Sequence, residues 1–580
     1  MKESLEKLKA SRVKFLFLVG LAVLVVLVRS FQLQVLQYRK FSRLAERNRT
    51  VKFPRRAPRG MILDRKGRVL AEARATFSLY IVRGFSRDLE KTLKIIAPIL
   101  ETTVEVLKGR LEEQKYLPKL QPVALADNLS ISQVSRLEAL REVFPEILVE
   151  AEPSRFYPYG KLAAHVVGYV GEVSLGEVKR MGLKPGEIVG KKGVEKEYDA
   201  QLRGEEGYVE VLRDSLGNPI KVLKEVLPRA GRDLKLSLDL DLQKIAREEM
   251  GGERGAVVIV SPTTGEILAM VSSPSFDPNL MSSRFSGREK VKIMTSPDKP
   301  LFTRAIQGTY PIGSIFKLAV AIAALSEGVV KPGERLFCPG FFPFGGRLFR
   351  CWTSAGHGWE NLPMAIKDSC NVYFYKVGKR LGIERMVKVV SKFPFGRRTG
   401  VDLPGERAGI LPSPEWKRKR FGVDWYPGET LSLSIGQGYF VATPLQVVLF
   451  LSAIANRGWY PIPHLKGDIP PVKIPTGLSP SVFRWVIRGM RLAVEEGTAR
   501  GAAVPGISVC GKTGTAQVVR LEKSKKIKPH SLFAAFAPCS NPRVAILVLV
   551  EHGGAGGKTA APMAGRILRR IFHEKAARNR

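Results

Sequence analysis

Three short motifs occur in one order along the second half of the chain, and they constrain its fold more than any other feature. They spell S-x-x-K, S-x-N and K-T-G, and they are Ser314-Ile315-Phe316-Lys317, Ser369-Cys370-Asn371 and Lys512-Thr513-Gly514-Thr515. Each pattern alone is short enough to occur by chance. All three in this order, with intervals long enough to hold a helical subdomain, predict one site that brings distant parts of the chain together.

The residue types fit a serine that becomes acylated, as in enzymes that react with penicillins or D-Ala-D-Ala peptides. A serine hydroxyl is a poor nucleophile at neutral pH and needs an adjacent base. If S-x-x-K begins a helix, Lys317 lies one turn beyond Ser314 on the same face. Lys317 can act as that base only when neutral, and burial or a second cation such as Lys512 lowers a lysine pKa.

The other motif residues are suited to binding the substrate. We expect Ser369 and Asn371 to complete a hydrogen-bonded relay and to hold the substrate amide. The segment Thr513-Gly514-Thr515 is suited to a terminal carboxylate, and its edge strand could supply one N–H donor for an oxyanion. A Ser-His-Asp hydrolase fits less well, because the chain has six His and the residues before Ser314 lack one Gly of a nucleophile elbow.

An apolar run from Phe15 to Val28, bracketed by Lys14 and Arg29, indicates a membrane segment near the N-terminus. Neighbouring apolar residues extend it to a predicted span over 13–33, and the flanking cations can snorkel. Without a small-residue cleavage site, it is predicted to be an uncleaved signal anchor with residues 1–12 in the cytoplasm and the remainder extracytoplasmic. A buried core helix is the alternative.

The formal net charge of +39 is extreme. Lys and Arg are spread along the chain without a recognisable DNA- or RNA-binding motif, so we expect no nucleic-acid partner. A basic exterior also suits anionic membrane and cell-wall surroundings, or simply a solvated surface.

The rest of the chain divides into two predicted parts. Residues 34–235 are expected to form an elongated mixed α/β pedestal without catalytic residues, including a charged helical stretch from Leu89 to Gln114. Residues 236–580 are expected to form an α+β domain, a five-stranded antiparallel sheet flanked by helices. The strands are expected at Gly255–Ser261, Glu266–Val271, Ser508–Val519, Ser531–Ala537 and Arg543–Glu551, and the helices at Leu240–Met250, Lys317–Ser326, Met364–Leu381, Pro444–Asn456 and Gly565–Ala576.

With these motifs in place, the chain resembles the class B, monofunctional penicillin-binding proteins over residues 10 to 575. The pedestal stretches that carry the resemblance are Arg59–Gly67, Arg155–Tyr169 and Gly193–Gly204. Within that class it is most similar to the type that serves cell elongation, through Tyr310-Pro311, Cys351-Trp352, Gly356-His357-Gly358, Trp425–Gly428 and Ile435–Tyr439. Ile312 and Ile315 stand where the family often has Pro and Thr, from which we expect a packing effect alone.

The resemblance implies the penicillin-binding, serine transpeptidase fold and a D,D-transpeptidase that cross-links peptidoglycan stem peptides without a catalytic cofactor. It implies that Ser314 is the nucleophile, Lys317 the base, Ser369, Asn371 and Lys512 its helpers, and the N–H groups of Ser314 and Thr515 the oxyanion hole. It also implies covalent inhibition by β-lactams, a SEDS-type glycosyltransferase partner and other elongation-complex proteins. The rival functions are a division-specific transpeptidase, a D,D-carboxypeptidase, a β-lactamase and a β-lactam sensor.

Cysteine placement raises a separate question about a metal. Cys338, Cys351 and Cys370 bracket His357, and three Cys with one His form a common structural zinc set. The spacing is not that of a standard finger, and two alternatives remain open. Cys338 and Cys351 could form a disulfide in an oxidising compartment, or the thiols could be free. Cys510 and Cys539 are interpreted as structural.

Overall fold

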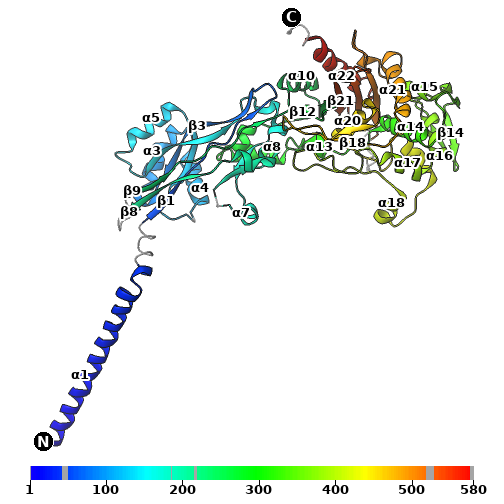
Figure 1. The fold of residues 1–580 in the computed structure, drawn as a ribbon. Helices are drawn as coiled ribbons and strands as arrows, with labels where there is room; N and C mark the ends of the chain where they lie inside the picture. The colour runs from blue at the N-terminus through cyan, green and yellow to red at the C-terminus, as the bar shows by residue number, and fades with distance from the viewer. Residues whose placement is uncertain are drawn as a thin grey trace.

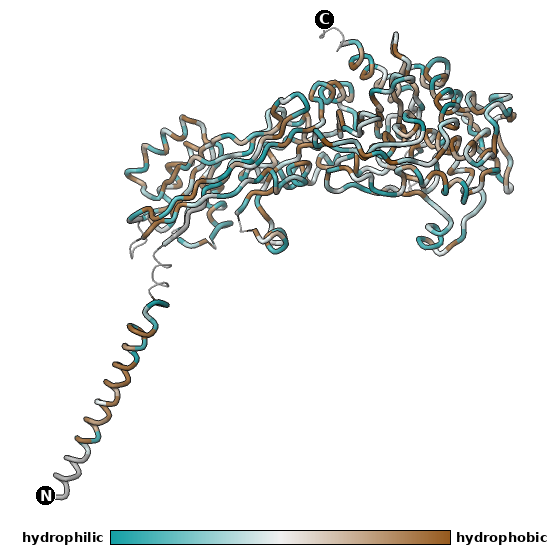
Figure 2. Tube along the Cα trace, viewed as in Figure 1, coloured by the Kyte–Doolittle hydropathy of each residue, from teal (hydrophilic) through white to brown (hydrophobic). Residues whose placement is uncertain are grey.

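The computed structural model describes residues 2–41, 50–115, 117–119, 121–183, 186–213, 219–517 and 528–574. It is elongated, with the N-terminal helix at one end and the C-terminal half of the chain at the other (Figure 1). Helix α1 (Lys2–Phe31) continues into a π-helical turn at Gln32–Leu36. In the part of the chain that the structure describes, the helical stretch Ser11–Leu36 is long and apolar enough to cross a membrane, and Figure 2 shows its hydrophobic colouring. The predicted span lies within it.

Two sheets build the pedestal. A three-stranded antiparallel sheet has the order β1-β8-β9, and a second sheet joins β10, β2, β3 and β4, with β5 also paired to the long strand β3. Helices α3, α4 and α5 pack their apolar faces against β3 and β4, so this end has its own core. The bounds are β1 (Thr50–Arg55), β2 (Ile62–Leu63), β3 (Val69–Ile81), β4 (Val123–Leu129), β5 (Ile147–Phe156), β8 (Gly207–Arg213), β9 (Pro219–Val226), β10 (Leu234–Lys235), α3 (Leu89–Ile99), α4 (Val104–Glu113) and α5 (Ile131–Leu140).

The predicted helical stretch from Leu89 to Gln114 is in fact two helices. Asp88 caps the N-terminus of α3, and Pro98 lies in its last turn. Thr103 caps α4 by accepting a hydrogen bond from the Val106 N–H. A second capping residue in mid-stretch favours a new helix start, which is why the chain turns between the two.

The three pedestal stretches of the resemblance converge on one buried carboxylate, Glu195. Arg59 donates to Glu195 at 2.9 Å and to Asp199 at 3.0 Å, and the Arg155 Nε donates to Glu195 at 2.6 Å. Burial alone would raise the pKa of Glu195, but the two guanidinium groups hold it below its usual value. This network ties together segments far apart in the sequence: β5, α8 (Gly193–Glu197), α9 (Asp199–Leu202) and the chain before β2.

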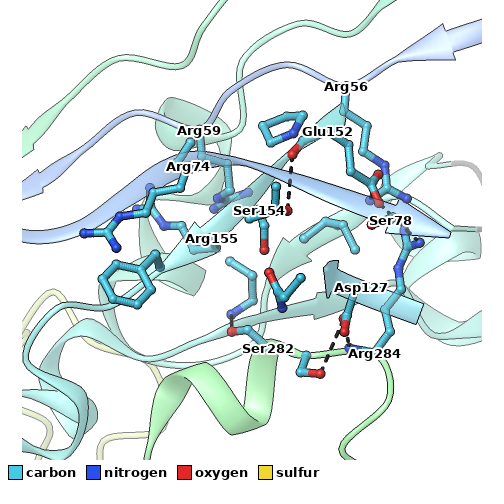
Figure 3. Close-up of a pocket in the computed structure, with 18 of the residues that line it drawn as sticks. Arg56, Arg59, Arg74, Ser78, Asp127, Glu152, Ser154, Arg155, Ser282 and Arg284 are labelled. Atoms are coloured by element: carbon cyan, nitrogen blue, oxygen red, sulfur yellow. Dashed lines mark hydrogen bonds and ion pairs between the residues drawn. The ribbon is translucent and has the colours of Figure 1, made fainter. Parts of the chain in front are cut away.

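A cavity of about 420 Å³ lies beside this network and is shown in Figure 3. Its wall mixes guanidinium and carboxylate groups. Glu152 faces Arg56 at 3.1 Å and Arg284 at 3.9 Å, so ion pairs cross the wall. Because Arg284 belongs to the second half of the chain, the cavity lies where the pedestal meets that half.

The second half is built on a five-stranded antiparallel sheet with the order β12-β11-β21-β20-β19. Every residue of β11, β12 and β21 is buried, because helices cover both faces of the sheet. The predicted sheet is therefore confirmed, although residues 518 and 519 of one expected strand lie outside the described residues. The bounds are β11 (Gly255–Val260), β12 (Ile267–Ser273), β19 (Cys510–Ala516), β20 (His530–Ala537) and β21 (Val544–Val550).

Three of the expected helices have nearly the predicted bounds, and two differ. The expected helix Met364–Leu381 is broken between Lys367 and Asn371. The expected terminal helix Gly565–Ala576 starts earlier and ends in a π-helical turn at Arg570–Glu574, while residues 575 and 576 are outside the described residues. The bounds are α10 (Leu240–Met250), α14 (Phe316–Ser326), α15 (Leu362–Lys367), α16 (Asn371–Leu381), α20 (Pro444–Ala455), α21 (Pro480–Glu495) and α22 (Ala560–Arg569).

Smaller elements fill the loops between these. They are β6 (Val170–Glu172), β7 (Ile188–Gly190), β13 (Leu336–Cys338), β14 (Phe341–Phe344), β15 (Arg347–Arg350), β16 (Gly358–Glu360), β17 (Trp459–Pro461), β18 (Lys473–Pro475), α6 (Ala164–Val167), α7 (Leu175–Met181), α11 (Pro278–Ser282), α12 (Gly287–Thr295), α13 (Arg304–Gln307), α17 (Ile383–Val390), α18 (Pro414–Phe421) and α19 (Pro427–Ser434).

Candidate active site

Ser314 lies on a 3-10 turn, Gly313–Ile315, that leads directly into α14. Helix α14 is apolar on all sides, as expected for a helix in the centre of a core. Its one charged residue, Lys317, is fully buried in the first turn. Ser314 itself is half-buried at the helix start. The predicted placement of serine and lysine at the beginning of one helix is what the structure has.

The Lys317 ammonium group is held by the S-x-N motif. Its Nζ donates to the Ser369 carbonyl oxygen at 2.7 Å and to the Asn371 Oδ1 at 2.6 Å, and it lies 3.4 Å from the Ser369 Oγ. Burial lowers the pKa of Lys317 to about 8. A neutral form is therefore accessible near physiological pH, as a general base requires.

Lys512 is fully buried on β19, and its Nζ has no hydrogen-bond partner among the described residues. Burial, and then the charge of Lys317, lower its pKa well below the usual lysine value. Lys512 is the expected second basic residue, but the repulsion between the two amines lowers the pKa of Lys512 and not that of Lys317. An unpartnered buried amine beside the serine turn is an open position for a substrate anion.

A break between α15 and α16 presents the S-x-N motif. Ser369 has φ +56, a left-handed conformation that ends one helix and redirects the chain. The Cys370 side chain then caps α16 by accepting from the Tyr373 N–H. The break turns the Ser369 carbonyl group and the Asn371 amide toward Lys317. An unbroken helix over Met364–Leu381 would not do so, and this corrects the prediction of one helix.

Strand β19 is the edge of the sheet and carries Thr513, Gly514 and Thr515. The Thr513 hydroxyl lies 3.4 Å from the Thr498 hydroxyl, and the Gly556 N–H donates to the Thr515 Oγ1 at 3.2 Å. Thr515 is exposed, as a group that meets substrate must be. Thr498 and Gly556 escaped the sequence prediction, because nothing local connects them to the K-T-G motif.

The serine turn approaches β19 too closely for side chains. A Cβ on Gly514 would lie 2.5 Å from the Ile312 carbonyl oxygen, and one on Gly313, whose φ is +53, would lie 2.5 Å from the Thr515 carbonyl oxygen. A Cβ on Gly436 would lie 2.0 Å from the Gly313 carbonyl oxygen. These glycines allow the turn, the edge strand and the segment around Gly436 to meet. Ile312 and Ile315 are both buried, in keeping with their expected packing role.

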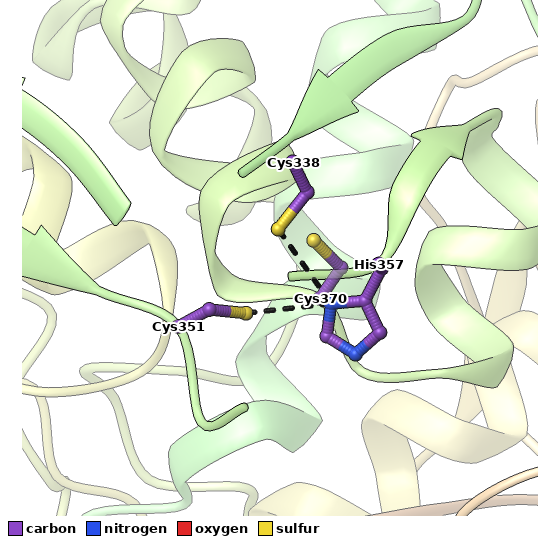
Figure 4. A group of neighbouring side chains, drawn as sticks. All are labelled: Cys338, Cys351, His357 and Cys370. Atoms are coloured by element: carbon purple, nitrogen blue, oxygen red, sulfur yellow. Dashed lines mark hydrogen bonds between the residues drawn. The ribbon is translucent and has the colours of Figure 1, made fainter. Parts of the chain in front are cut away.

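The four predicted metal ligands also meet, around Cys370 of the S-x-N motif (Figure 4). The ligand atoms of Cys338, Cys351, His357 and Cys370 lie within 4.8 Å of one another. The His357 Nδ1 is 3.6 Å from the Cys338 Sγ and 3.5 Å from the Cys351 Sγ. In tetrahedral zinc sites with ordinary bond lengths, sulfur and nitrogen ligands are about 3.5 Å apart. The donor set and its spacing fit zinc.

The alternative disulfide between Cys338 and Cys351 is wrong, because neither sulfur atom is bonded to another cysteine. The physical reason is that both sulfur atoms face the His357 ring rather than bonding to each other. The cluster also contacts the active site directly, since the Asn371 N–H donates to the Cys351 Sγ at 3.3 Å. Cys510 and Cys539 form a disulfide across the end of β19 and β20.

Comparison with known proteins agrees with this architecture. The penicillin-binding protein transpeptidase domain matches residues 255–569, and the penicillin-binding protein dimerisation domain matches residues 54–236. Peptidoglycan D,D-transpeptidase MrdA of Acinetobacter baumannii is 36% identical, over 97% of this chain and 88% of its own. MrdA of Escherichia coli K12 is 33% identical, over 94% of this chain and 91% of its own.

Solved structures of similar proteins share this fold. The PBP2 of Helicobacter pylori, solved in complex with MreC, has a TM-score of 0.81 and 32% identity, over 91% of this chain and 99% of its own. A chain of a peptidoglycan synthase complex has a TM-score of 0.72 and 31% identity, over 96% of this chain and 97% of its own. The chain belongs to the class B penicillin-binding proteins, in the branch of PBP2, the MrdA transpeptidases.

Proposed function

We propose that this protein is the D,D-transpeptidase that cross-links peptidoglycan stem peptides during cell-wall elongation. The observation that carries the proposal is the buried Lys317 amine, held by Ser369 and Asn371 one turn from Ser314, beneath the K-T-G edge strand. The identity with MrdA relatives over nearly the whole chain supports the elongation role.

In the acylation step, the Ser314 Oγ attacks the carbonyl carbon of the penultimate D-Ala. The hydroxyl proton passes to the Lys317 Nζ, and the backbone N–H groups of Ser314 and Thr515 stabilise the oxyanion. The amide bond to the terminal D-Ala then breaks, and its nitrogen takes the proton from Lys317 through the relay of Ser369, with Lys512 assisting, so that Lys317 is neutral again. Thr513, Gly514 and Thr515 hold the terminal carboxylate, with the charge of Lys512 behind them.

In the second step, the amine of a neighbouring stem peptide attacks the acyl ester. As the new amide forms, the attacking amine loses a proton to the neutral Lys317; the ester bond to the Ser314 Oγ breaks, and the oxygen takes that proton from Lys317. Asn371 orients the lysine and the peptide amide in both steps. No cofactor takes part, because the nucleophile, base and oxyanion donors all come from the chain.

The test is reconstitution with glycan strands that carry pentapeptide stems and with the polymerase partner. We expect cross-linked dimers together with one released D-Ala for each cross-link, and neither product from Ser314→Ala. Release of D-Ala without dimers would favour the rival D,D-carboxypeptidase, and dimers from Ser314→Ala would contradict the proposed nucleophile.

The same proposal covers topology and partners. Residues 1–12 are placed in the cytoplasm, 13–33 in the membrane, and the pedestal (34–235) and transpeptidase domain (236–580) outside it, in the single-pass manner expected of the family. The partners are a SEDS-type glycosyltransferase and other elongation-complex proteins, with β-lactams as covalent inhibitors. The solved complex of a similar PBP2 with MreC supports the assembly role.

The rival of a division-specific transpeptidase is separated by phenotype, since loss of an elongation enzyme gives round cells and loss of a division enzyme gives filaments. A one-time β-lactam sensor is disfavoured because relatives that match nearly the whole chain are peptidoglycan D,D-transpeptidases.

We also propose that Cys338, Cys351, His357 and Cys370 hold a structural zinc ion. The fit of their spacing to tetrahedral coordination supports it. The ion would fix Cys370, and with it the two flanking residues that hold Lys317, to the loops that carry the other ligands. Its contribution would be to the rigidity of the site and not to the chemical steps.

A further inference from the structure

Helix α18 (Pro414–Phe421) projects from the transpeptidase region (Figure 1). Two of its aromatic rings form a cluster with a third ring from another segment. Trp416 and Phe421 belong to the helix, and Tyr439 comes from the loop before α20. The ring centroids of each pair lie 5.3 to 5.7 Å apart. Phe421 is 50% exposed and Tyr439 is 37% exposed. We call these three residues the aromatic ridge. Trp416 is half-buried, so two neighbouring large aromatic rings are exposed together. Contiguous exposed apolar surface of this kind is a feature of interaction sites.

The cations on the same helix divide into an inward and an outward group. Lys417 is buried, where it donates to Glu429 at 2.8 Å and to the Asp424 carbonyl oxygen at 2.7 Å, so it fixes the helix to the chain that follows. Lys419 and Arg420 are exposed and take part in no ion pair within the described residues. They therefore offer free positive charge beside the aromatic ridge.

The aromatic ridge borders the turn that carries the nucleophile. The backbones of Tyr310 and Ala442 exchange two hydrogen bonds of 2.9 Å, and Gly436 meets the Gly313 carbonyl group. Tyr439 lies midway along this paired segment, between Gly436 and Ala442. A ligand on the aromatic ridge would thus contact a segment that runs alongside the approach to Ser314.

From this placement we infer that the aromatic ridge, with Lys419 and Arg420, is a binding site for a peptidoglycan strand entering the active site. The apolar C–H faces of pyranose rings pack on exposed aromatic rings, and the carboxylates of the stem peptides complement the two free cations. The inference rests on the proposed function, because it names the part of the protein that holds that function's polymeric substrate.

A membrane surface is the other ligand that a basic, aromatic helix can suggest. The position of α18 argues against it. Figure 1 places α18 and the β1-β8-β9 sheet, which follows the anchor helix, at opposite ends of the molecule. The segment between Gly436 and Ala442 also connects the aromatic ridge to the turn that carries Ser314, and lipid binding would not require this connection.

The test uses the full chain in nanodiscs and soluble, uncross-linked glycan strands with pentapeptide stems as the probe. For Lys419→Glu with Arg420→Glu, we expect the dissociation constant for the strands to rise about fivefold or more, since two favourable charge contacts become repulsive. Phe421→Ala should weaken binding in the same direction. The matched control is Arg484→Glu with Arg488→Glu, which makes the same charge change on exposed positions of α21 and should bind as the unaltered protein does.

Unchanged affinity in the variants, or an equal loss in the control pair, would overturn the inference. Hydrogen exchange over 414–426 gives a second measurement. Protection on adding strands supports the site, whereas protection that appears only when neutral nanodisc lipid is replaced by anionic lipid overturns it. Acylation by benzylpenicillin is measured alongside, because it reports on Ser314. An unaltered protein that failed to acylate would contradict the proposed function and not the ridge.

Discussion

The Lys317 Nζ lies 2.6 Å from the Asn371 Oδ1, although the two residues belong to different helices. The contact exists because α15 ends at Lys367 and the chain reverses through the left-handed Ser369 before α16 begins. A neutral amide, and not a carboxylate, therefore holds the buried lysine. This choice of partner leaves the pKa of Lys317 low enough for it to act as a base.

The first prediction concerns the pH dependence of acylation. With a Lys317 pKa of about 8, the neutral amine is the minor form at pH 7 and the major form at pH 9, so the acylation rate should rise about tenfold between them. Stopped-flow measurement with a chromogenic cephalosporin checks this. Asn371→Asp would add a negative charge beside the amine, raise its pKa and move the rise to higher pH. A profile that is flat from pH 7 to pH 9 in the unaltered protein would contradict Lys317 as the base.

The second prediction concerns the close approach of β19 to the serine turn. Gly514→Ala would place a methyl group 2.5 Å from the Ile312 carbonyl oxygen. The turn must shift, so we expect acylation to slow by about 100-fold, because small displacements of reacting groups cost that much. The matched control is Gly252→Ala, where a Cβ meets no atom within 4 Å. A Gly514→Ala variant that acylates at the normal rate would show that the close approach does not position Ser314.

The third prediction concerns the buried pedestal network. Glu195→Gln removes the carboxylate between Arg59 and Arg155 and should destabilise the pedestal by about 3–5 kcal/mol, measured by thermal or chemical unfolding. Because the folded pKa of Glu195 is depressed, its stabilisation is present above its ordinary value of 4.5 and is lost as the pH falls through the folded pKa. The difference between protein and variant should therefore shrink in acid.

Glu205→Gln is the control for that network, because the Glu205 pair with Arg229 is largely exposed. Its effect should stay within about 1 kcal/mol. Equal effects of the two substitutions would contradict a special role for the buried carboxylate.

The fourth prediction concerns the metal. The full chain, purified without added metal, should contain about one zinc ion per molecule when measured by inductively coupled plasma mass spectrometry. Cys351→Ser should lose it, and Cys539→Ser, which alters the disulfide, should keep it. A chelator should lower the unfolding temperature of the protein but not of Cys351→Ser. A well-folded protein without zinc would contradict the proposal.

Much of this architecture was predictable because its signals are local. The continuous apolar runs Gly255–Val260 and Ile267–Ser273, separated by turn residues, predicted a hairpin of buried strands. The helix Leu240–Met250 has the expected bounds. The three motifs could be joined because their chemistry requires each other. The four metal ligands could be grouped for the same reason, because three Cys and one His within a short stretch form a common structural zinc set.

Other features depend on contacts that no local pattern contains. The break at Ser369 brings the Ser369 carbonyl group and the Asn371 amide to Lys317, a residue 52 positions before Ser369 in the chain. Thr498 and Gly556 approach the K-T-G hydroxyls from distant loops. The aromatic ridge forms because Tyr439 contacts α18. Nothing in the sequence around Tyr439 or in α18 indicates that these two segments are neighbours.

The intact mass of the full chain, measured with and without benzylpenicillin and beside Ser314→Ala, shows whether Ser314 is the nucleophile that becomes acylated. We expect one stable adduct on the unaltered protein, none on Ser314→Ala, and slow loss of the adduct over time. Rapid loss with turnover of the drug would indicate a β-lactamase. A protein that is folded but forms no adduct would contradict the assignment of Ser314, Lys317 and Lys512 to one active site.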